Sequence, residues 1–141
     1  MGTYLVRGGK RIEGEFAVRG SKNAALPILA ACVLAADEVV LENLPQIRDV
    51  SQTLEILREL GCSVTLTGRT AVIDSRDMQA AALCGEAVRK MRSSILFLGA
   101  MLGRSGVGRI AYPGGCAIGK RPIDLHLAAF RRMGVSIAEE N

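Results

Sequence analysis

The sequence contains an internal repeat, which restricts the fold to an architecture built from two similar units. Residues 22–29 (KNAALPIL) match residues 92–99 (RSSILFLG), because each segment begins with a cation, continues with small residues and ends in an apolar run. Residues 54–64 match residues 127–137 in the same way. The offset is 70 residues in the first match (92 − 22) and 73 in the second (127 − 54), so the second copy carries three extra residues.

The three extra residues fall near residues 112–120, a stretch that contains Pro-Gly-Gly-Cys. An insertion at one point of a repeated scaffold typically marks a functional loop, because loops tolerate added residues and carry function. Within this loop Cys116 lies four and five residues before Lys120 and Arg121. Nearby cations lower the pKa of a thiol, so the pattern favours a functional Cys116 over an idle exposed cysteine.

Hydrophobic periodicity predicts the same elements in both copies. A helix that is apolar on all sides should be buried between layers, whereas the second helix of each copy has one apolar face and ends at a glycine cap. In the first copy we expect a helix over 23–35, a strand over 39–43, a helix over 50–60 capped by Gly61, and a hairpin of strands 64–67 and 70–73. In the second copy we expect a helix over 93–102 after a lead-in at 88–91, a strand over 109–112, a helix capped by Gly134, and a strand over 135–138.

The opening segment lies outside both copies, and its alternating residues 4–7 and 11–18 predict two strands. The predicted class is therefore α/β (α+β), with two βαβαββ-like units. We expect three parts: opening strands at 1–19, a first unit at 20–85 and a second unit at 86–141. The second unit is expected to stop before its last strand, which leaves a sheet edge without a neighbour.

Composition excludes several functions. The 141 residues carry a net charge of +4, but the basic residues are scattered, and two Tyr, three Phe and no Trp provide few stacking surfaces for nucleic acid. The four cysteines form no CxxC pair, and with His126 as the only histidine a Cys/His zinc site is not expected. The sequence has no signal peptide and no apolar run of membrane-spanning length, so we expect a cytoplasmic protein without membrane contact.

Two pairs of cations occupy equivalent positions in the copies. Lys22 and Arg92 each stand at the start of an apolar helix, and Arg48 and Arg121 each precede the second helix. Helix N-termini favour anions, so these cations predict an anion site, and the alternative is that they are solvated cations at helix ends. Asp124, in the first turn of the second helix, is interpreted as a capping residue rather than a base, and His126 as a helix-face residue.

Three motifs resemble those of the UDP-N-acetylglucosamine 1-carboxyvinyltransferase family. They are GSKNAALP at residues 20–27, MRSS at 91–94 and PGGCAIGKRPIDLH at 113–126, and the resemblance runs through essentially the whole chain. The third motif is highly specific, since the related enolpyruvylshikimate-phosphate synthases share the fold but are not expected to have this cysteine loop. The resemblance implies the enolpyruvate transferase fold, an inside-out α/β barrel in which three such units surround buried helices. The two copies would be two of the three units of one domain, and the opening strands would complete another domain.

The resemblance also implies a reaction and its substrates. The family transfers the enolpyruvyl group of phosphoenolpyruvate to the 3-hydroxyl of UDP-N-acetylglucosamine and releases phosphate, which begins peptidoglycan synthesis. The resemblance implies that Cys116 is the general acid and the covalent residue, and that fosfomycin alkylates it. It implies no cofactor and no metal. The resemblance implies that Lys22 and Asn23 contact phosphoenolpyruvate. It also implies that UDP-N-acetylglucosamine is contacted by Arg92, Arg121, Pro122, Ile123, Asp124 and Leu125.

The family's enzymes are roughly three times as long as this chain. We therefore expect the 141 residues to be an N-terminal fragment that is inactive alone and that self-associates through exposed apolar faces. The alternative is a non-catalytic module that binds a nucleotide-sugar or phosphate, or only packs against a partner.

Overall fold

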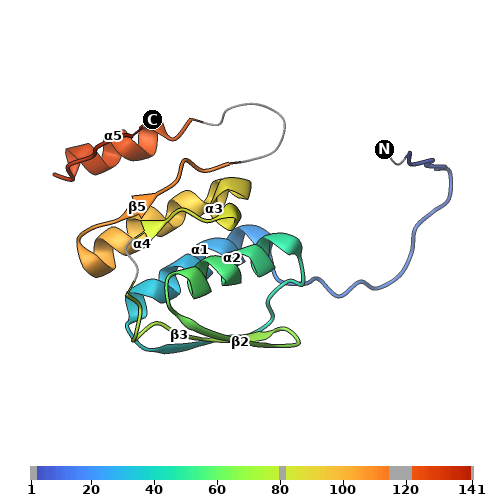
Figure 1. Cartoon of the computed structure of the whole chain (residues 1–141). Coiled ribbons are helices and arrows are strands. Elements are labelled where there is room, and N and C mark those ends of the chain that lie inside the picture. The colour runs from blue at the N-terminus through green and yellow to red at the C-terminus, as the bar shows by residue number, and fades with distance from the viewer. Residues whose placement is uncertain (1–2, 80–81, 115–121, 141) are drawn as a thin grey trace.

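A computed structural model describes residues 3–79, 82–114 and 122–140 (Figure 1). The first copy consists of α1 (Lys22–Ala35), β1 (Glu38–Leu41), α2 (Arg48–Glu59), β2 (Ser63–Thr67) and β3 (Thr70–Asp74). β4 (Ala82–Leu83) follows, and the second copy contains α3 (Glu86–Lys90), the 3-10 turn η1 (Arg92–Ser94), α4 (Ile95–Ser105), β5 (Arg109–Ile110) and α5 (Asp124–Arg132). The predicted α/β class and the order of the helices in the two copies are confirmed.

The first copy ends in a three-stranded antiparallel sheet in the order β1-β3-β2. Gly68 forms the turn between β2 and β3 with a φ of +60°, a left-handed conformation that glycine adopts without steric cost. On the central strand, Ala71 and Ile73 are fully buried, because alternate side chains of a strand point to the same face. That face packs on the helices of the first copy, which form the next layer in Figure 1.

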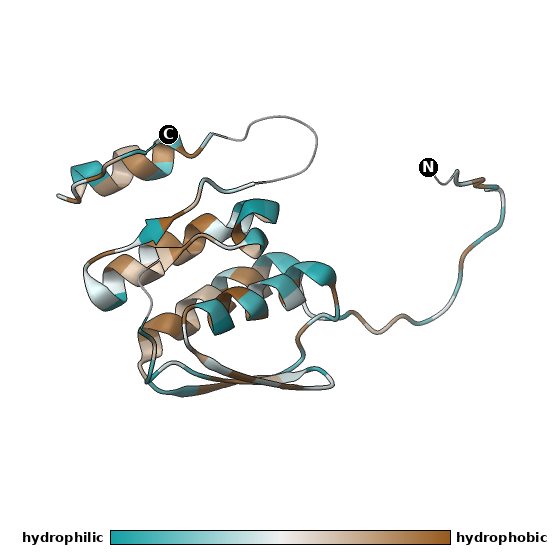
Figure 2. Ribbon diagram, viewed as in Figure 1, coloured by the Kyte–Doolittle hydropathy of each residue, from teal (hydrophilic) through white to brown (hydrophobic). Residues whose placement is uncertain are grey.

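The second copy stacks on the first through its helices. α1 packs against both α2 and α4, and α3 with α4 forms a layer above α1 and α2 in Figure 1. β4 and β5 form a short parallel pair, and α5 lies beyond them on the outer side. Figure 2 shows apolar residues along α1 and α4, the two helices at the centre of this stack.

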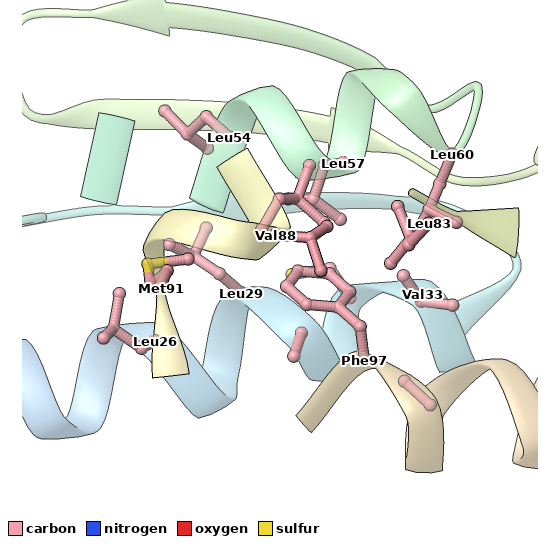
Figure 3. Close-up of a cluster of buried hydrophobic side chains, with 14 of the residues drawn as sticks. Leu26, Leu29, Val33, Leu54, Leu57, Leu60, Leu83, Val88, Met91 and Phe97 are labelled. Carbon is pink, nitrogen blue, oxygen red and sulfur yellow. The ribbon is translucent and has the colours of Figure 1, made fainter. Parts of the chain in front are cut away.

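One buried cluster joins the two copies. Leu29 and Val33 of α1, Leu57 of α2 and Phe97 of α4 are each at most 1% exposed. Figure 3 shows the Phe97 ring between Val88 and the side chains of α1. Burial of this apolar surface is the main force that holds the copies together.

The helix ends establish the repeat in atomic detail. Cys62 N–H donates to the Leu57 carbonyl at 3.0 Å, and Val135 N–H donates to the Phe130 carbonyl at the same distance, 73 residues further on (135 − 62). Ala36 and Gly106, 70 residues apart (106 − 36), both end their helices in the left-handed conformation. The additional three residues of the second copy therefore lie between position 106 and position 134, as the sequence predicts.

Three expectations are wrong for this chain. Residues 3–20 contain no strand and are almost fully exposed, because they have no neighbour to pair with their backbone groups. Residues 135–138 are likewise not a strand. α1 is not buried on all sides, since Ile28 and Leu34 are 48% and 51% exposed on the face that no element covers. The expected role of residues 1–19 in another domain, and the division into units at 20–85 and 86–141, stay predictions.

No helix in the described part of the chain is both long enough and apolar enough to cross a membrane.

Candidate functional site

Lys22 is the first residue of α1, so the predicted position at the mouth of this helix is confirmed, although the helix begins one residue earlier than expected. Ser21 precedes it with extended backbone and makes no side-chain capping hydrogen bond, so the first N–H groups of the helix have no side-chain acceptor from Ser21. Asn23 follows, also exposed. Pro27 lies inside α1 and has no N–H to donate to the Asn23 carbonyl four residues earlier. The start of α1 therefore offers a cation and N–H donors that the Ser21 side chain does not cap.

The Lys22 ammonium forms an ion pair with the Asp49 carboxylate in the first turn of α2. The two side chains are 52% and 32% exposed, so water screens the pair and its contribution to stability is small. The pair brings the N-termini of α1 and α2 together. Sequence reasoning missed Asp49, although its position just after Arg48 at a helix start was a usable signal.

Arg92 lies at the same end of the molecule. The Thr53 hydroxyl, one turn after Asp49, donates to the Asp49 carbonyl at 2.8 Å and lies 3.7 Å from the Met91 sulfur. Figure 3 shows Met91 beside Leu26, at the end of the buried cluster where α1 begins. Arg92 follows directly, is exposed, and forms no ion pair within residues 3–79, 82–114 and 122–140. Lys22 and Arg92 thus stand at the starts of two adjacent equivalent helical segments.

Two glycines fix the backbone around these positions. A Cβ on Gly20 would overlap the carbonyl oxygen of Asn43, so only glycine lets the chain approach that loop before it enters α1. A Cβ on Gly114 would overlap the carbonyl oxygen of Arg89 at the end of α3. Pro113 is buried beside it. The start of the cysteine loop is therefore anchored against α3, the helix that precedes Arg92.

Two predicted site residues, Cys116 and Arg121, lie outside the described residues. The chain is described again from Pro122, which is exposed, and Ile123, which is 5% exposed and packs in the core. Asp124 begins α5, where a carboxylate interacts favourably with the helix dipole. The Leu125 side chain is 78% exposed, which is unusual for leucine, and His126 is exposed on the same helix.

Burial separates Cys32 and Cys62 from a reactive role. Burial raises the pKa of the Cys32 thiol to about 11, and burial raises the pKa of Cys62 as well. Cys84 is exposed. In the described part of the chain, no three side chains of His, Cys, Asp or Glu are grouped to hold a metal ion.

The comparisons with known proteins identify the family. A family model described as EPSP synthase (3-phosphoshikimate 1-carboxyvinyltransferase) matches residues 6–141. The chain belongs to the EPSP synthase family. Within it, similar relatives at 40–48% identity are named UDP-N-acetylglucosamine 1-carboxyvinyltransferase.

Two of these relatives of the EPSP synthase family show how much is shared. The protein named UDP-N-acetylglucosamine 1-carboxyvinyltransferase 2 of Caldanaerobacter subterraneus subsp. tengcongensis is 45% identical over 99% of this chain and 33% of its own length. The protein named UDP-N-acetylglucosamine 1-carboxyvinyltransferase 1 of Symbiobacterium thermophilum is 48% identical over 96% of this chain and 32% of its own length. The chain thus spans about one third of the length of the curated relatives it matches.

A solved structure is also similar. The enolpyruvyl transferase NikO from Streptomyces tendae superimposes with a TM-score of 0.63 and 29% identity, over 72% of this chain and 24% of that chain. Together with the family match, this likeness confirms the expected enolpyruvyl transferase fold.

Proposed function

We propose that this chain supplies part of the active site of an enzyme that transfers the enolpyruvyl group of phosphoenolpyruvate to the 3-hydroxyl of UDP-N-acetylglucosamine and releases phosphate. The observation that carries the proposal is the position of Lys22 and Arg92, each the first residue of an equivalent helical segment, in a chain whose relatives bear that enzyme's name. The product would enter peptidoglycan synthesis in the cytoplasm.

Phosphoenolpyruvate carries a phosphate and a carboxylate, so its site needs preorganised cations and N–H donors. The start of α1 offers the Lys22 ammonium and N–H groups that the Ser21 side chain does not cap, which supports a role for Lys22 and Asn23 in holding this substrate. Asp49 would position the Lys22 side chain through their ion pair. The Asp49 carboxylate would also hold the Lys22 side chain in one orientation when the substrate is absent.

UDP-N-acetylglucosamine would be bound by Arg92 and by residues 121–125. Arg92 is an exposed guanidinium without an acidic partner in the described residues, suited to a diphosphate. The exposed Leu125 side chain offers an apolar contact, and Ile123, fixed in the core, would hold residues 121–125 in place. No cofactor and no metal is needed, since the cations neutralise the substrates.

Cys116 would act as the general acid. Addition of a proton to C3 of phosphoenolpyruvate makes C2 electrophilic, and the sugar hydroxyl attacks C2 and gives up its proton to a base. Phosphate then leaves from the tetrahedral intermediate as C3 loses a proton, which restores the double bond of the enolpyruvyl group. The anchoring of Gly114 against α3 supports a defined starting point for this loop. Lys120 and Arg121 favour the thiolate, so the anionic substrate must offset them to keep the thiol protonated. The same thiol could also add to C2 covalently, and it is the residue that fosfomycin would alkylate.

A non-catalytic module is the second candidate, favoured by the one-third coverage of the relatives. The two are separated by measuring phosphate release with both substrates and UDP-N-acetylglucosamine binding by calorimetry, on the 141-residue chain and on the chain joined to the remaining two thirds of a relative. The proposal expects binding but no turnover from the 141 residues and turnover from the joined protein. If the joined protein binds the nucleotide-sugar but releases no phosphate, whereas the intact relative does, the catalytic assignment fails.

A further inference from the structure

The connection between β1 and α2, residues 42–47, borders the candidate site on two sides. The carbonyl oxygen of Asn43 faces Gly20, two residues before Lys22, and leaves no room there for a Cβ. In Figure 1 the connection rises from the sheet to α2 beside the point where the opening segment enters α1. α2 begins directly after the connection and carries Asp49 in its first turn. The conformation of this connection therefore sets the starts of both helices, and with them the two ends of the Lys22–Asp49 ion pair.

The connection begins with an irregular backbone. In the β1–β3 ladder Leu41 lies opposite Ala71, so a continued ladder would place residue 43 opposite residue 69. Instead the Leu44 N–H donates to the Arg69 carbonyl at 2.9 Å, which means that one extra residue is accommodated, as in a β-bulge. Asn43 adopts a left-handed φ of +58° at this point. A residue that is not glycine keeps this conformation only when its surroundings hold it there.

The Arg69 side chain supplies that hold. Its Nη2 donates to the side-chain oxygen of Asn43, and its Nε donates to the Leu44 carbonyl at 3.4 Å. Together with the Arg69 carbonyl, three groups of one residue therefore contact two successive residues of the connection. The planar guanidinium suits this task because it presents several N–H donors in a fixed arrangement. Arg69 is exposed, and in the part of the chain that the structure describes it forms no ion pair.

A second arginine provides a contrast within the same copy. Arg58, in the last turn of α2, is also exposed, and its Nη2 donates to the Val64 carbonyl of β2 at 3.2 Å. This hydrogen bond ties the end of α2 to the start of the hairpin. The Arg69 hydrogen bonds instead reach Asn43, the residue against which Gly20 packs. Of the two arginines, Arg69 is thus the one connected to the start of α1.

We propose that Arg69 is a positioning residue for the substrate groups at the start of α1. It holds residues 42–47 in the conformation against which Gly20 packs, and so fixes the direction in which Lys22 and the first N–H groups of α1 face. The inference rests on the proposed function, because it concerns the same phosphoenolpyruvate site. Arg69 acts through the backbone of the connection and not by contact with the substrate. Groups that are already oriented bind more tightly, since less ordering is left to the binding step.

The test titrates phosphoenolpyruvate into the 141-residue chain and follows the backbone amide NMR signals of residues 20–25. Arg69→Ala should shift these signals before any ligand is added, because the start of α1 is no longer held. It should also weaken phosphoenolpyruvate binding at least about fivefold. Arg58→Ala is the matched control, since it removes an exposed arginine and its hydrogen bond to a backbone carbonyl, and it should leave both readouts unchanged. Urea denaturation checks that the variants are folded.

Arg69→Lys separates positioning from charge. A lysine keeps the positive charge, but its single ammonium does not reproduce the two side-chain hydrogen bonds of the guanidinium, so Arg69→Lys should also bind less tightly. This variant replaces Arg69→Ala if the alanine variant does not fold. Normal binding by Arg69→Lys would show that only charge matters and would overturn the proposal.

Two further outcomes distinguish this inference from the proposed function. Unchanged signals at residues 20–25 in Arg69→Ala, in a chain that binds phosphoenolpyruvate, would overturn the positioning role and leave the proposed function intact. If the unaltered chain does not bind phosphoenolpyruvate, the assignment of this substrate to the start of α1 fails. The signals of residues 20–25 then still decide whether Arg69 orients the start of the helix.

Discussion

Gly61 and Gly134 occupy equivalent positions in the two copies and have the same backbone φ of 89°. Each follows the second helix of its copy and donates its N–H to a carbonyl three residues earlier, Arg58 at 2.9 Å and Arg131 at 3.0 Å. A left-handed residue at this point turns the chain from the helix into the next segment. The shared geometry predicts a shared response to mutation.

Replacing either glycine by alanine should lower the free energy of unfolding by about 1–2 kcal/mol, because a Cβ is unfavourable in the left-handed region. Urea denaturation of Gly61→Ala and Gly134→Ala measures this. Gly8→Ala is the control, since Gly8 lies in the exposed opening segment with no atom near its Cβ position. Equal stability of all three variants would contradict the expected cost, and unequal losses at Gly61 and Gly134 would contradict the equivalence of the caps.

Gly99 and Gly114 should respond in opposite directions to the same substitution. Gly99 lies within α4, and an added Cβ would meet the Phe130 ring at 3.6 Å, an ordinary contact, so Gly99→Ala should stabilise by about 0.5–1 kcal/mol. Gly114→Ala should destabilise, because its Cβ overlaps the backbone carbonyl of Arg89 and the loop must shift. Thermal melts compare the two variants with the unaltered chain. A stabilised Gly114→Ala chain would show that the loop start is not anchored as described.

The hydrogen bonds of Asp74 predict how the stability of the folded chain changes at acidic pH. Hydrogen bonds from the Arg76 side chain and N–H hold the pKa of Asp74 at about 2, below its ordinary value of 3.8. A carboxyl with a lowered pKa stabilises the folded state above pH 4, and this contribution is lost as the pH falls toward 2. Asp74→Asn should therefore flatten the fall in stability between pH 4 and pH 2. Asp77→Asn is the matched control, and an identical pH profile in both variants would contradict the assignment.

The cysteines should differ in their rate of alkylation. At pH 8 a thiol with a pKa of about 11 is roughly one part in a thousand thiolate, and Cys32 is also buried. Brief treatment with iodoacetamide followed by peptide mapping should leave Cys32 and Cys62 unlabelled. The sequence alone predicts that Cys116 reacts fastest, whereas the exposure of Cys84 makes Cys84 the competitor to measure. Faster labelling of Cys84 than of Cys116 would contradict an activated thiol in the loop.

Lys22→Ala, made in a protein that joins this chain to the rest of a relative, should weaken substrate binding or turnover at least about tenfold. A charge-assisted contact to phosphate contributes about 1.5–3 kcal/mol, and no neighbouring residue replaces it. Lys10→Ala removes the same charge from the exposed opening segment and should have no effect. Kinetics at varied phosphoenolpyruvate provide the measurement. Equal losses in both variants would indicate a general effect of charge and not a contact at α1.

Local signals predicted much of the fold. The apolar stripe through Val50, Leu54 and Leu57 marked α2, and the glycine caps marked where the second helices end. The 70- and 73-residue offsets also hold for the helix ends at Gly106 and Gly134, so the three added residues lie between these two positions. The sequence also placed Lys22 at the mouth of α1, which begins one residue earlier than predicted.

The elements that were predicted wrongly depend on pairing between distant parts of the chain. Residues 4–7, 11–18 and 135–138 have strand patterns, but a strand forms only when another strand accepts its hydrogen bonds. The same limit applies to α1, whose apolar composition does not reveal which face is covered, and Ile28 lies exposed. The Lys22–Asp49 pair escaped prediction because it joins side chains 27 residues apart (49 − 22).

The three added residues of the second copy enter between two helix ends, Gly106 and Gly134, whose conformations match those of the first copy. The backbone at these two helix ends is held by local hydrogen bonds, from Gly106 N–H to the Leu102 carbonyl and from Gly134 N–H to the Arg131 carbonyl. Length and composition of the loop between them could be altered, by grafting or by natural variation, while the frame that carries Arg92 and α5 keeps its shape. In this chain, the loop residues that could vary and the helix-end residues that the fold requires lie in separate stretches of sequence.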